Sequence, residues 1–184
     1  MSIRNIEIKA RCRDHEHIRR VLMENRADYK GLDQQTDTYY RVGSGRLKLR
    51  EGRIENNLIH YHRQDSTGPK KSAVTLFPLK QDKYGDPGTI HPLKKILADV
   101  LGILMVVVKR REIYFIDNIK FHLDTVDGLG RFVEIEAIDT DGAIGEDRLH
   151  DQCRRFIRLF DISGEDMVAG SYSDMMAENS GRDG

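Results

Sequence analysis

Residues 3–13 read Ile-Arg-Asn-Ile-Glu-Ile-Lys-Ala-Arg-Cys-Arg, and polar and apolar residues alternate strictly from Asn5 to Arg13. Such a period of two is typical of a β-strand with one buried face. Charges of both signs, Glu7 and Lys9 among them, fall on the polar face. Small and branched apolar side chains form the opposite face: Ile6, Ile8, Ala10 and Cys12. The stretch therefore predicts an amphipathic strand.

The same period recurs along most of the chain. Strands are predicted over residues 34–42, 46–53, 57–64, 104–115, 119–126 and 131–138, with one more at 72–79. Helices are predicted at about 14–25, 91–100 and 146–160. Gly43-Ser44-Gly45 is typical of a hairpin turn between the second and third strands. These elements predict an α+β fold with a mostly antiparallel sheet, either strongly curved or closed into a barrel.

Length and charge limit the classes of function. With 184 residues the chain fits one domain, predicted over 1–178 with a frayed tail at 179–184. Thirty basic residues balance thirty acidic ones, which argues against nucleic acid as a partner. The sequence contains neither a long apolar run nor a secretion signal, so we expect no membrane partner and a cytoplasmic location. Two distant cysteines without a C-x-x-C pair suggest no zinc ribbon or disulfide framework.

The polar strand faces segregate by charge, and this pattern has two interpretations. Acidic side chains gather on the first and last strands and basic side chains mainly on the middle ones. The faces could be the solvated side of a half-buried sheet. Alternatively, they could line a barrel, because eight strands can enclose one small ligand that supplies the counter-charge. Periodicity alone favours the solvated face.

Several motifs, spaced in order, resemble the CYTH superfamily, which includes class IV adenylyl cyclases, thiamine triphosphatases and related tripolyphosphatases. The motifs are Asn5-Ile6-Glu7-Ile8-Lys9, Gln35 to Tyr40, Leu47 to Arg50, Tyr61-x-Arg63, Val107-x-Lys109-x-Arg111, His122-Leu123-Asp124 and Gly128 to Glu136. Ser171-Tyr172-Ser173-Asp174 looks like the closing segment of the class IV cyclase branch. The resemblance implies a closed eight-stranded antiparallel β-barrel, the triphosphate tunnel, with its charged faces inward and with peripheral helices.

The resemblance also implies a metal site. Its acidic residues are Glu7, Asp124, Glu134 and Glu136. Because clustered carboxylates repel one another, a divalent ion is their natural partner, and Mg²⁺ or Mn²⁺ prefers oxygen ligands. Asn5 stands where the family usually has a glutamate, so a second metal position there is in doubt.

Inward cations are implied to bind the phosphates. The implied phosphate-binding set is Lys9, Lys48, Arg50, Arg63, Lys109 and Arg111, of which Lys9, Arg50 and Arg111 are the candidate catalytic residues. Arginine forms forked hydrogen bonds to phosphate oxygens, and lysine supplies a compact charge. In an empty barrel these cations are expected to repel one another.

Three functions remain open at this stage. The first is a metal-dependent hydrolase of a triphosphate such as ATP, thiamine triphosphate or tripolyphosphate. The second is a class IV adenylyl cyclase that forms cyclic AMP and pyrophosphate. The third is a non-catalytic domain that binds polyphosphate or a nucleotide. The sequence is compatible with a homodimer.

Overall fold

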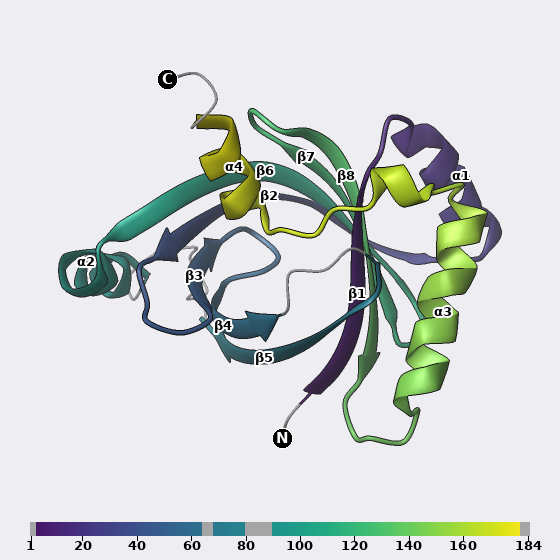
Figure 1. Cartoon of the computed structure of the whole chain (residues 1–184), viewed down its shortest axis with the longest axis horizontal. Coiled ribbons are helices and arrows are strands. Elements are labelled where there is room, and N and C mark those ends of the chain that lie inside the picture. The colour runs from purple at the N-terminus through teal and green to yellow at the C-terminus, as the bar shows by residue number, and fades with distance from the viewer. Residues whose placement is uncertain (1–2, 64–67, 80–89, 181–184) are drawn as a thin grey trace.

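Eight antiparallel strands close into a barrel with the neighbour order β1-β5-β4-β3-β2-β6-β7-β8. The computed structural model describes residues 3–63, 68–79 and 90–180. The strands are β1 (Ile3–Arg11), β2 (Asp28–Tyr40), β3 (Arg46–Glu51), β4 (Asn57–Arg63), β5 (Lys70–Pro78), β6 (Ile103–Ile116), β7 (Ile119–Val126) and β8 (Gly130–Asp139). Closure comes from β1, which pairs with β5 on one side and with β8 on the other (Figure 1). The predicted fold class is confirmed.

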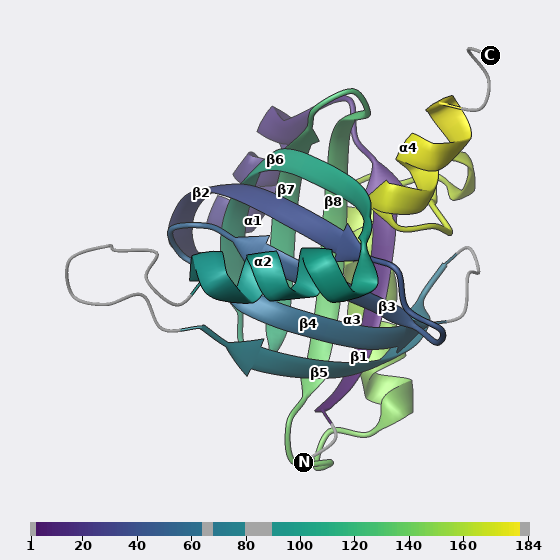
Figure 2. The same ribbon diagram turned by 90° about the vertical axis from the view of Figure 1, so that its left-hand side faces the viewer.

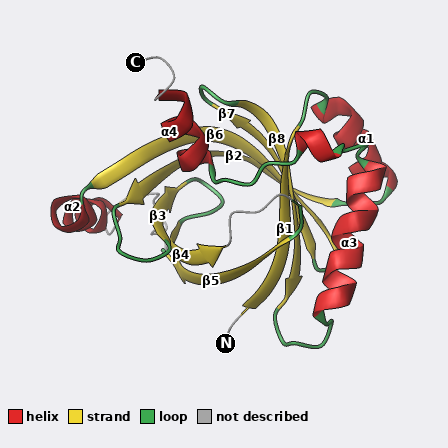
Figure 3. Cartoon of the chain, viewed as in Figure 1, coloured by secondary structure: helices red, strands yellow, loops and turns green. Residues whose placement is uncertain are grey.

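The helices lie outside the ring of strands (Figure 3). They are α1 (His15–Glu24), α2 (Ile90–Leu101), α3 (Glu146–Leu159) and α4 (Tyr172–Ser180), with a short 3₁₀ turn at Gly164–Asp166. Asp14 caps α1 by accepting a hydrogen bond from the His17 amide at 3.1 Å. In the described part of the chain, no helix has the length and apolarity needed to cross a bilayer.

The barrel carries its apolar faces outward and its polar faces inward. The largest core lies between the outer face of β1, β7 and β8 and the helices α1 and α3, where Phe121 packs edge to face against Phe156 and Phe160. A second cluster packs α2 over Tyr40 and Leu49 of β2 and β3. Burying one such side chain stabilises the fold by about 1.5–3 kcal/mol. The helices therefore remove the outer faces of β1, β7 and β8 and part of β2 and β3 from water, whereas outward residues such as Phe77 and Val106 stay exposed. The charged residues are left inside.

Two elements differ from the sequence prediction. β2 begins at Asp28 rather than at residue 34, and a bulge at Gly31, whose φ is +129°, interrupts the alternation that would have shown it. α4 was not predicted, because its apolar residues follow no helical stripe. This helix includes Asn179 and Ser180, which were expected to be frayed, while 181–184 lie outside the described residues.

α4 lies at one end of the barrel, the end at which β3 begins (Figure 2). The chain reaches this position through a bridge between Met167 and Ala10 of β1 and a hydrogen bond of 2.9 Å from the Val168 amide to the Lys9 carbonyl oxygen. At the opposite end, the β3–β4 loop (52–56) connects Glu51 to Asn57. The interior of the barrel thus lies between α4 and this loop.

Candidate active site

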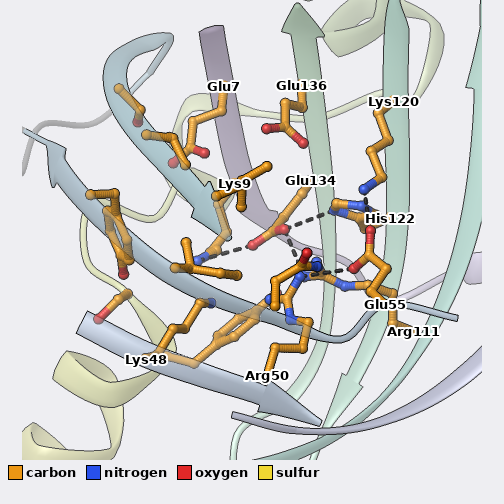
Figure 4. A pocket seen from close by; sticks show the side chains of 18 of the residues that line it. Glu7, Lys9, Lys48, Arg50, Glu55, Arg111, Lys120, His122, Glu134 and Glu136 are labelled. Carbon is orange, nitrogen blue, oxygen red and sulfur yellow. Dashed lines mark hydrogen bonds and ion pairs between the residues drawn. The ribbon is translucent and has the colours of Figure 1, made fainter. Parts of the chain in front are cut away.

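A polar cavity of about 150 Å³ fills the middle of the barrel (Figure 4). All eight strands, the β3–β4 loop and the start of α4 contribute to its wall: Glu7, Lys9, Tyr39, Lys48, Arg50, Glu55, Asn57, Ile59, Tyr61, Ser72, Val74, Leu76, Lys109, Arg111, Lys120, His122, Glu134, Glu136, Ser171 and Tyr172. One buried water occupies about 10–15 Å³ of cavity volume, so the cavity is large enough for a small polyatomic ligand. The inward-facing interpretation of the charged strands is therefore correct.

Asp37 of β2 is the counter-ion for three of the predicted phosphate-binding cations. It is fully buried, and it accepts a forked pair of hydrogen bonds from Arg50 at 2.8 and 2.9 Å. The ammonium groups of Lys48 and Lys109 lie 2.9 and 2.6 Å from its Oδ2 atom. Burial alone would raise the pKa of Asp37, but Arg50, Lys109 and Lys48 hold it well below the usual value. This carboxylate therefore fixes the direction in which all three cations point.

Arg111 of β6 is held in the same way by two carboxylates. Its guanidinium donates to both oxygens of Asp124, at 2.7 and 2.5 Å, and to Glu134 Oε2 at 2.8 Å. The Tyr172 hydroxyl completes the coordination of Asp124 by donating to Oδ2 at 2.7 Å. Asp124 is fully buried behind the wall of the cavity. Its position is that of a support for Arg111, whereas the sequence had suggested a metal ligand.

Glu134 of β8 lies at the centre of the site. Its oxygens contact Lys9 Nζ at 3.1 Å, Arg111 at 2.8 Å and His122 Nδ1 at 3.0 Å. Burial alone would raise the pKa of Glu134, but Arg111 and Lys9 hold it well below its usual value. Burial, with Arg111 and Lys120 nearby, lowers the pKa of His122 to about 4, so its imidazole is neutral at pH 7. Since a carboxylate only accepts, Nδ1 carries the proton and Nε2 is an acceptor.

The expected repulsion between the cations is present, but the cations are also paired. Burial and the neighbouring Arg50, Arg111 and Lys48 lower the pKa of Lys109 well below its usual value, while Asp37 opposes this shift. Lys9, Arg50, Lys109 and Arg111 each contact at least one interior carboxylate. The sequence analysis had paired the acidic residues with a metal ion and had given Asp37 no role. In the barrel, the cations instead form ion pairs with buried carboxylates. Removing one partner of such a pair leaves the other as an unpaired buried charge.

Glu7, Glu136 and Lys120 form one row across β1, β8 and β7. Glu7 lies directly opposite Glu136 in the strand register, and Glu136 lies opposite Lys120. Burial raises the pKa of Glu136 to about 7; Lys120 opposes this shift, and Glu7 and Glu134 add to it. Asn5 Nδ2 donates to Glu136, while the buried Asn5 Oδ1 has no hydrogen-bond partner among the described residues. Two like charges and an unpartnered oxygen thus meet at one place.

A divalent ion would fit the chemistry of this row. Carboxylate oxygens of Glu7 and Glu136 and the amide oxygen of Asn5 are hard donors of the kind that Mg²⁺ and Mn²⁺ prefer. Within residues 3–63, 68–79 and 90–180, no three His, Cys, Asp or Glu side chains are already gathered around one metal position. Glu134, the remaining predicted ligand, lies two residues from Glu136 on β8 and is turned toward cations. The donor set fits, but side chains would have to move to coordinate the ion.

The structure brings most predicted site residues together and adds several more. Lys9, Lys48, Arg50, Lys109, Arg111, Glu7, Glu134 and Glu136 all line the cavity. Arg63 ends β4, and its side chain lies outside the described part of the chain. Lys120 was missed although it alternates with the predicted inward residue Asp124, and Asp37 was missed although it belongs to the Gln35 to Tyr40 motif. Glu55 comes from a loop, where no periodic signal exists. Tyr172 belongs to the motif Ser171 to Asp174, but its place in the cavity wall was not predicted.

A model of the CYTH domain family matches residues 4–172, nearly the whole chain. Among solved structures, protein PH1012 of Pyrococcus horikoshii OT3 is 24% identical with a TM-score of 0.67, covering 92% of this chain and 98% of its own. A candidate adenylate cyclase of Vibrio parahaemolyticus is 17% identical with a TM-score of 0.70, covering 94% and 97%. A candidate adenylyl cyclase of Hippeastrum, for which a dominant triphosphatase activity is described, is 15% identical with a TM-score of 0.56, covering 96% and 96%. A sequence search of curated proteins found no match.

Proposed function

The chain belongs to the CYTH domain family, and we propose that it is a divalent-metal-dependent enzyme that hydrolyses a triphosphate inside its barrel. The observation that carries this proposal is the convergence of inward cations from three strands on one cavity: Lys9, Lys48, Arg50, Lys109 and Arg111. A triphosphate needs several cations along its length, and fixed donors stabilise the charge that develops during phosphoryl transfer.

The interior carboxylates give these cations their catalytic value. Asp37 fixes Lys48, Arg50 and Lys109, and Asp124 fixes Arg111. A cation that is already oriented does not need to reorganise when the substrate binds, which is the source of electrostatic catalysis. We assign Lys9, Arg50 and Arg111 to direct contact with the phosphates, and Asp37 and Asp124 to positioning.

The metal and the nucleophile would be held by different residues next to Glu134. Glu7, Glu136 and the Asn5 oxygen would hold Mg²⁺ or Mn²⁺, which supplies neutralisation of phosphate charge. His122 donates from Nδ1 to Glu134, so its Nε2 lone pair is available to accept a hydrogen bond from an attacking water. These assignments support hydrolysis with cations and a histidine that are already in place, whereas the metal ligands would move to coordinate the ion.

Cyclase activity is the second candidate. Ser171 and Tyr172, from the segment that resembles class IV cyclases, line the cavity at the end where α4 begins. The fold does not choose between the reactions, because the Hippeastrum neighbour is named a candidate adenylyl cyclase and is described with a dominant triphosphatase activity. The choice depends on which phosphorus atom faces the nucleophile.

Product analysis separates the candidates. The purified protein is incubated with Mg²⁺ and ATP, thiamine triphosphate or tripolyphosphate, and products are resolved by ion-exchange chromatography. We expect inorganic phosphate and the corresponding diphosphate, with no turnover in excess chelator. Formation of cyclic AMP and pyrophosphate from ATP would show that the protein is a cyclase and not a hydrolase. Binding of all three compounds without any product would assign a non-catalytic domain.

The Asn5→Glu substitution tests the metal assignment. A charged oxygen binds a hard cation better than an amide oxygen does, so the Mg²⁺ concentration for half-maximal rate should fall, by about tenfold or more. The measurement is a Mg²⁺ titration of the hydrolysis rate for both proteins, with Asn25→Asp on the outside of the barrel as a control. An unchanged or raised Mg²⁺ requirement would remove residue 5 from the metal site.

A further inference from the structure

Glu55 is a buried carboxylate that enters the cavity from the β3–β4 loop. Its Oε2 atom accepts from Arg50 at 2.8 Å and from Gln35 at 3.0 Å, and its Oε1 atom pairs with Lys120. Only 14% of the side chain is exposed. Figure 4 shows Lys120 pointing toward it from the opposite wall. Glu55 thus holds the place between a guanidinium and an ammonium group that a phosphate would otherwise take.

The loop is built to hold Glu55 in this position. Fully buried Asp33 accepts hydrogen bonds from three successive amides, those of Arg53, Ile54 and Glu55, at 2.7, 3.1 and 3.0 Å. Residue 52 must be glycine, since a Cβ there would lie 2.6 Å from Asp33 Oδ2. A loop anchored by a buried carboxylate is fixed in place, so Glu55 is a permanent part of the wall.

The inward face of β3 shows where Glu55 lies along the tunnel. Arg46, Lys48 and Arg50 follow one another on this face over about 13 Å, at about 3.3 Å per residue. At one end, Asp174 of α4 pairs with Arg46 at 2.8 Å. At the other end, Glu55 pairs with Arg50. Carboxylates from outside the sheet therefore terminate the row of cations at both ends.

We propose that Glu55 limits the length of the phosphate chain that the tunnel accepts, so that the substrate class is triphosphates and longer linear polyphosphates are rejected. This inference rests on the proposed function. A fourth phosphate would have to approach the Glu55 carboxylate, because the Asp174 carboxylate of α4 already ends the row of cations on the opposite side. Placing like charges next to each other costs several kcal/mol and is a general device for excluding a wrong partner.

The test compares tripolyphosphate with tetrapolyphosphate. Dissociation constants are measured by titration calorimetry in chelator, where binding is observed without turnover, and kcat/KM is measured with Mg²⁺. Glu55→Gln keeps the shape of the side chain and leaves Arg50 with its Asp37 partner. We expect the substitution to raise both the affinity and the kcat/KM for tetrapolyphosphate, relative to those for tripolyphosphate, by about tenfold or more. The reason is that it removes the repulsion between the Glu55 carboxylate and the fourth phosphate.

Two controls define the outcome. Glu51→Gln removes a carboxylate from the same hairpin that pairs outside the barrel with Lys94 at 2.6 Å, and it should leave the ratio unchanged. Lys120→Met breaks the same ion pair from the other side but keeps the Glu55 charge, so the preference for tripolyphosphate should remain. An unchanged ratio in Glu55→Gln, or an equal rise in Lys120→Met, overturns the length limit. Absence of tripolyphosphate turnover in the unmodified protein would instead contradict the proposed hydrolase, and the calorimetric ratio would still test Glu55.

Discussion

Glu136→Gln should lower the Mg²⁺-dependent kcat for triphosphate hydrolysis by about 10²–10³-fold, the usual loss when one fixed electrostatic contact to the reacting group is removed. The carboxylate of Glu136 lies opposite Glu7 and beside the unpartnered Asn5 oxygen, where a hard cation would be bound. Glutamine preserves the shape of the side chain but removes its charge. Initial rates at saturating substrate and several Mg²⁺ concentrations measure the effect.

Stability distinguishes this loss from unfolding. Burial raises the pKa of Glu136 to about 7, from 4.5 in the unfolded chain. An acid with a raised folded pKa destabilises the fold increasingly as pH rises between these two values, and in full above the higher one. Without metal at pH 8, the melting temperature of Glu136→Gln should therefore equal or exceed that of the unmodified protein. Near-normal turnover, or turnover that persists in excess chelator, would contradict the metal role; Glu24→Gln at the exposed end of α1 is the control.

The period of two predicted the strands and the residues that share a face, but it could not show which face points inward. A solvated sheet and a lined tunnel produce the same alternation along each strand. The difference is closure, which depends on β1 pairing with both β5 and β8, and these contacts join residues far apart in the sequence. Resemblance to a family supplied this step, and the register confirms it.

Residues that do not belong to the alternating strands could not be placed in the cavity wall from the sequence. Glu55 enters the cavity because three loop amides wrap around Asp33, and Tyr172 because the C-terminal segment bonds along β1. Neither arrangement follows from the alternation of residues, although the resemblance of the segment 171–174 to a family motif did single out Tyr172. Asp37 is a different case. It alternates with Gln35 and Tyr39, so its inward direction was readable, but its three partners come from β3 and β6.

The interior carboxylates are the counter-ions of the tunnel cations when no ligand is bound. Cations that are already paired do not need a ligand to be stable, so a polyphosphate must compete with interior carboxylates for them. The affinity for a polyphosphate then depends on whether each cation has N–H donors left for the phosphate while it stays bonded to its carboxylate. Arg50 and Arg111 can share because a guanidinium has five donors, whereas a lysine ammonium has three. Removal of an interior anion should therefore lower the stability of the ligand-free protein and increase the stabilisation that a bound polyphosphate provides.

Asp37→Asn is expected to show both consequences. It leaves Lys48, Arg50 and Lys109 buried without their shared anion, and breaking a buried pair costs about 3–5 kcal/mol. For a chain of this size that corresponds to a melting temperature lower by about 6–20 °C. Asp28→Asn, which breaks the exposed pair with Lys30, should change stability by no more than about 0.5 kcal/mol.

The pH and ligand dependence identify the cause of the loss. The cations hold the pKa of Asp37 well below its ordinary value of 3.8, so its stabilisation is present above pH 3.8 and disappears as pH falls toward the lower folded value. The stability difference between Asp37→Asn and the unmodified protein should accordingly shrink in acid. Tripolyphosphate can replace the missing anion, and it should raise the melting temperature of Asp37→Asn more than that of the unmodified protein. Equal stability of the two proteins at pH 7, or an equal response to tripolyphosphate, would show that Asp37 is not the anion that holds the tunnel cations in place.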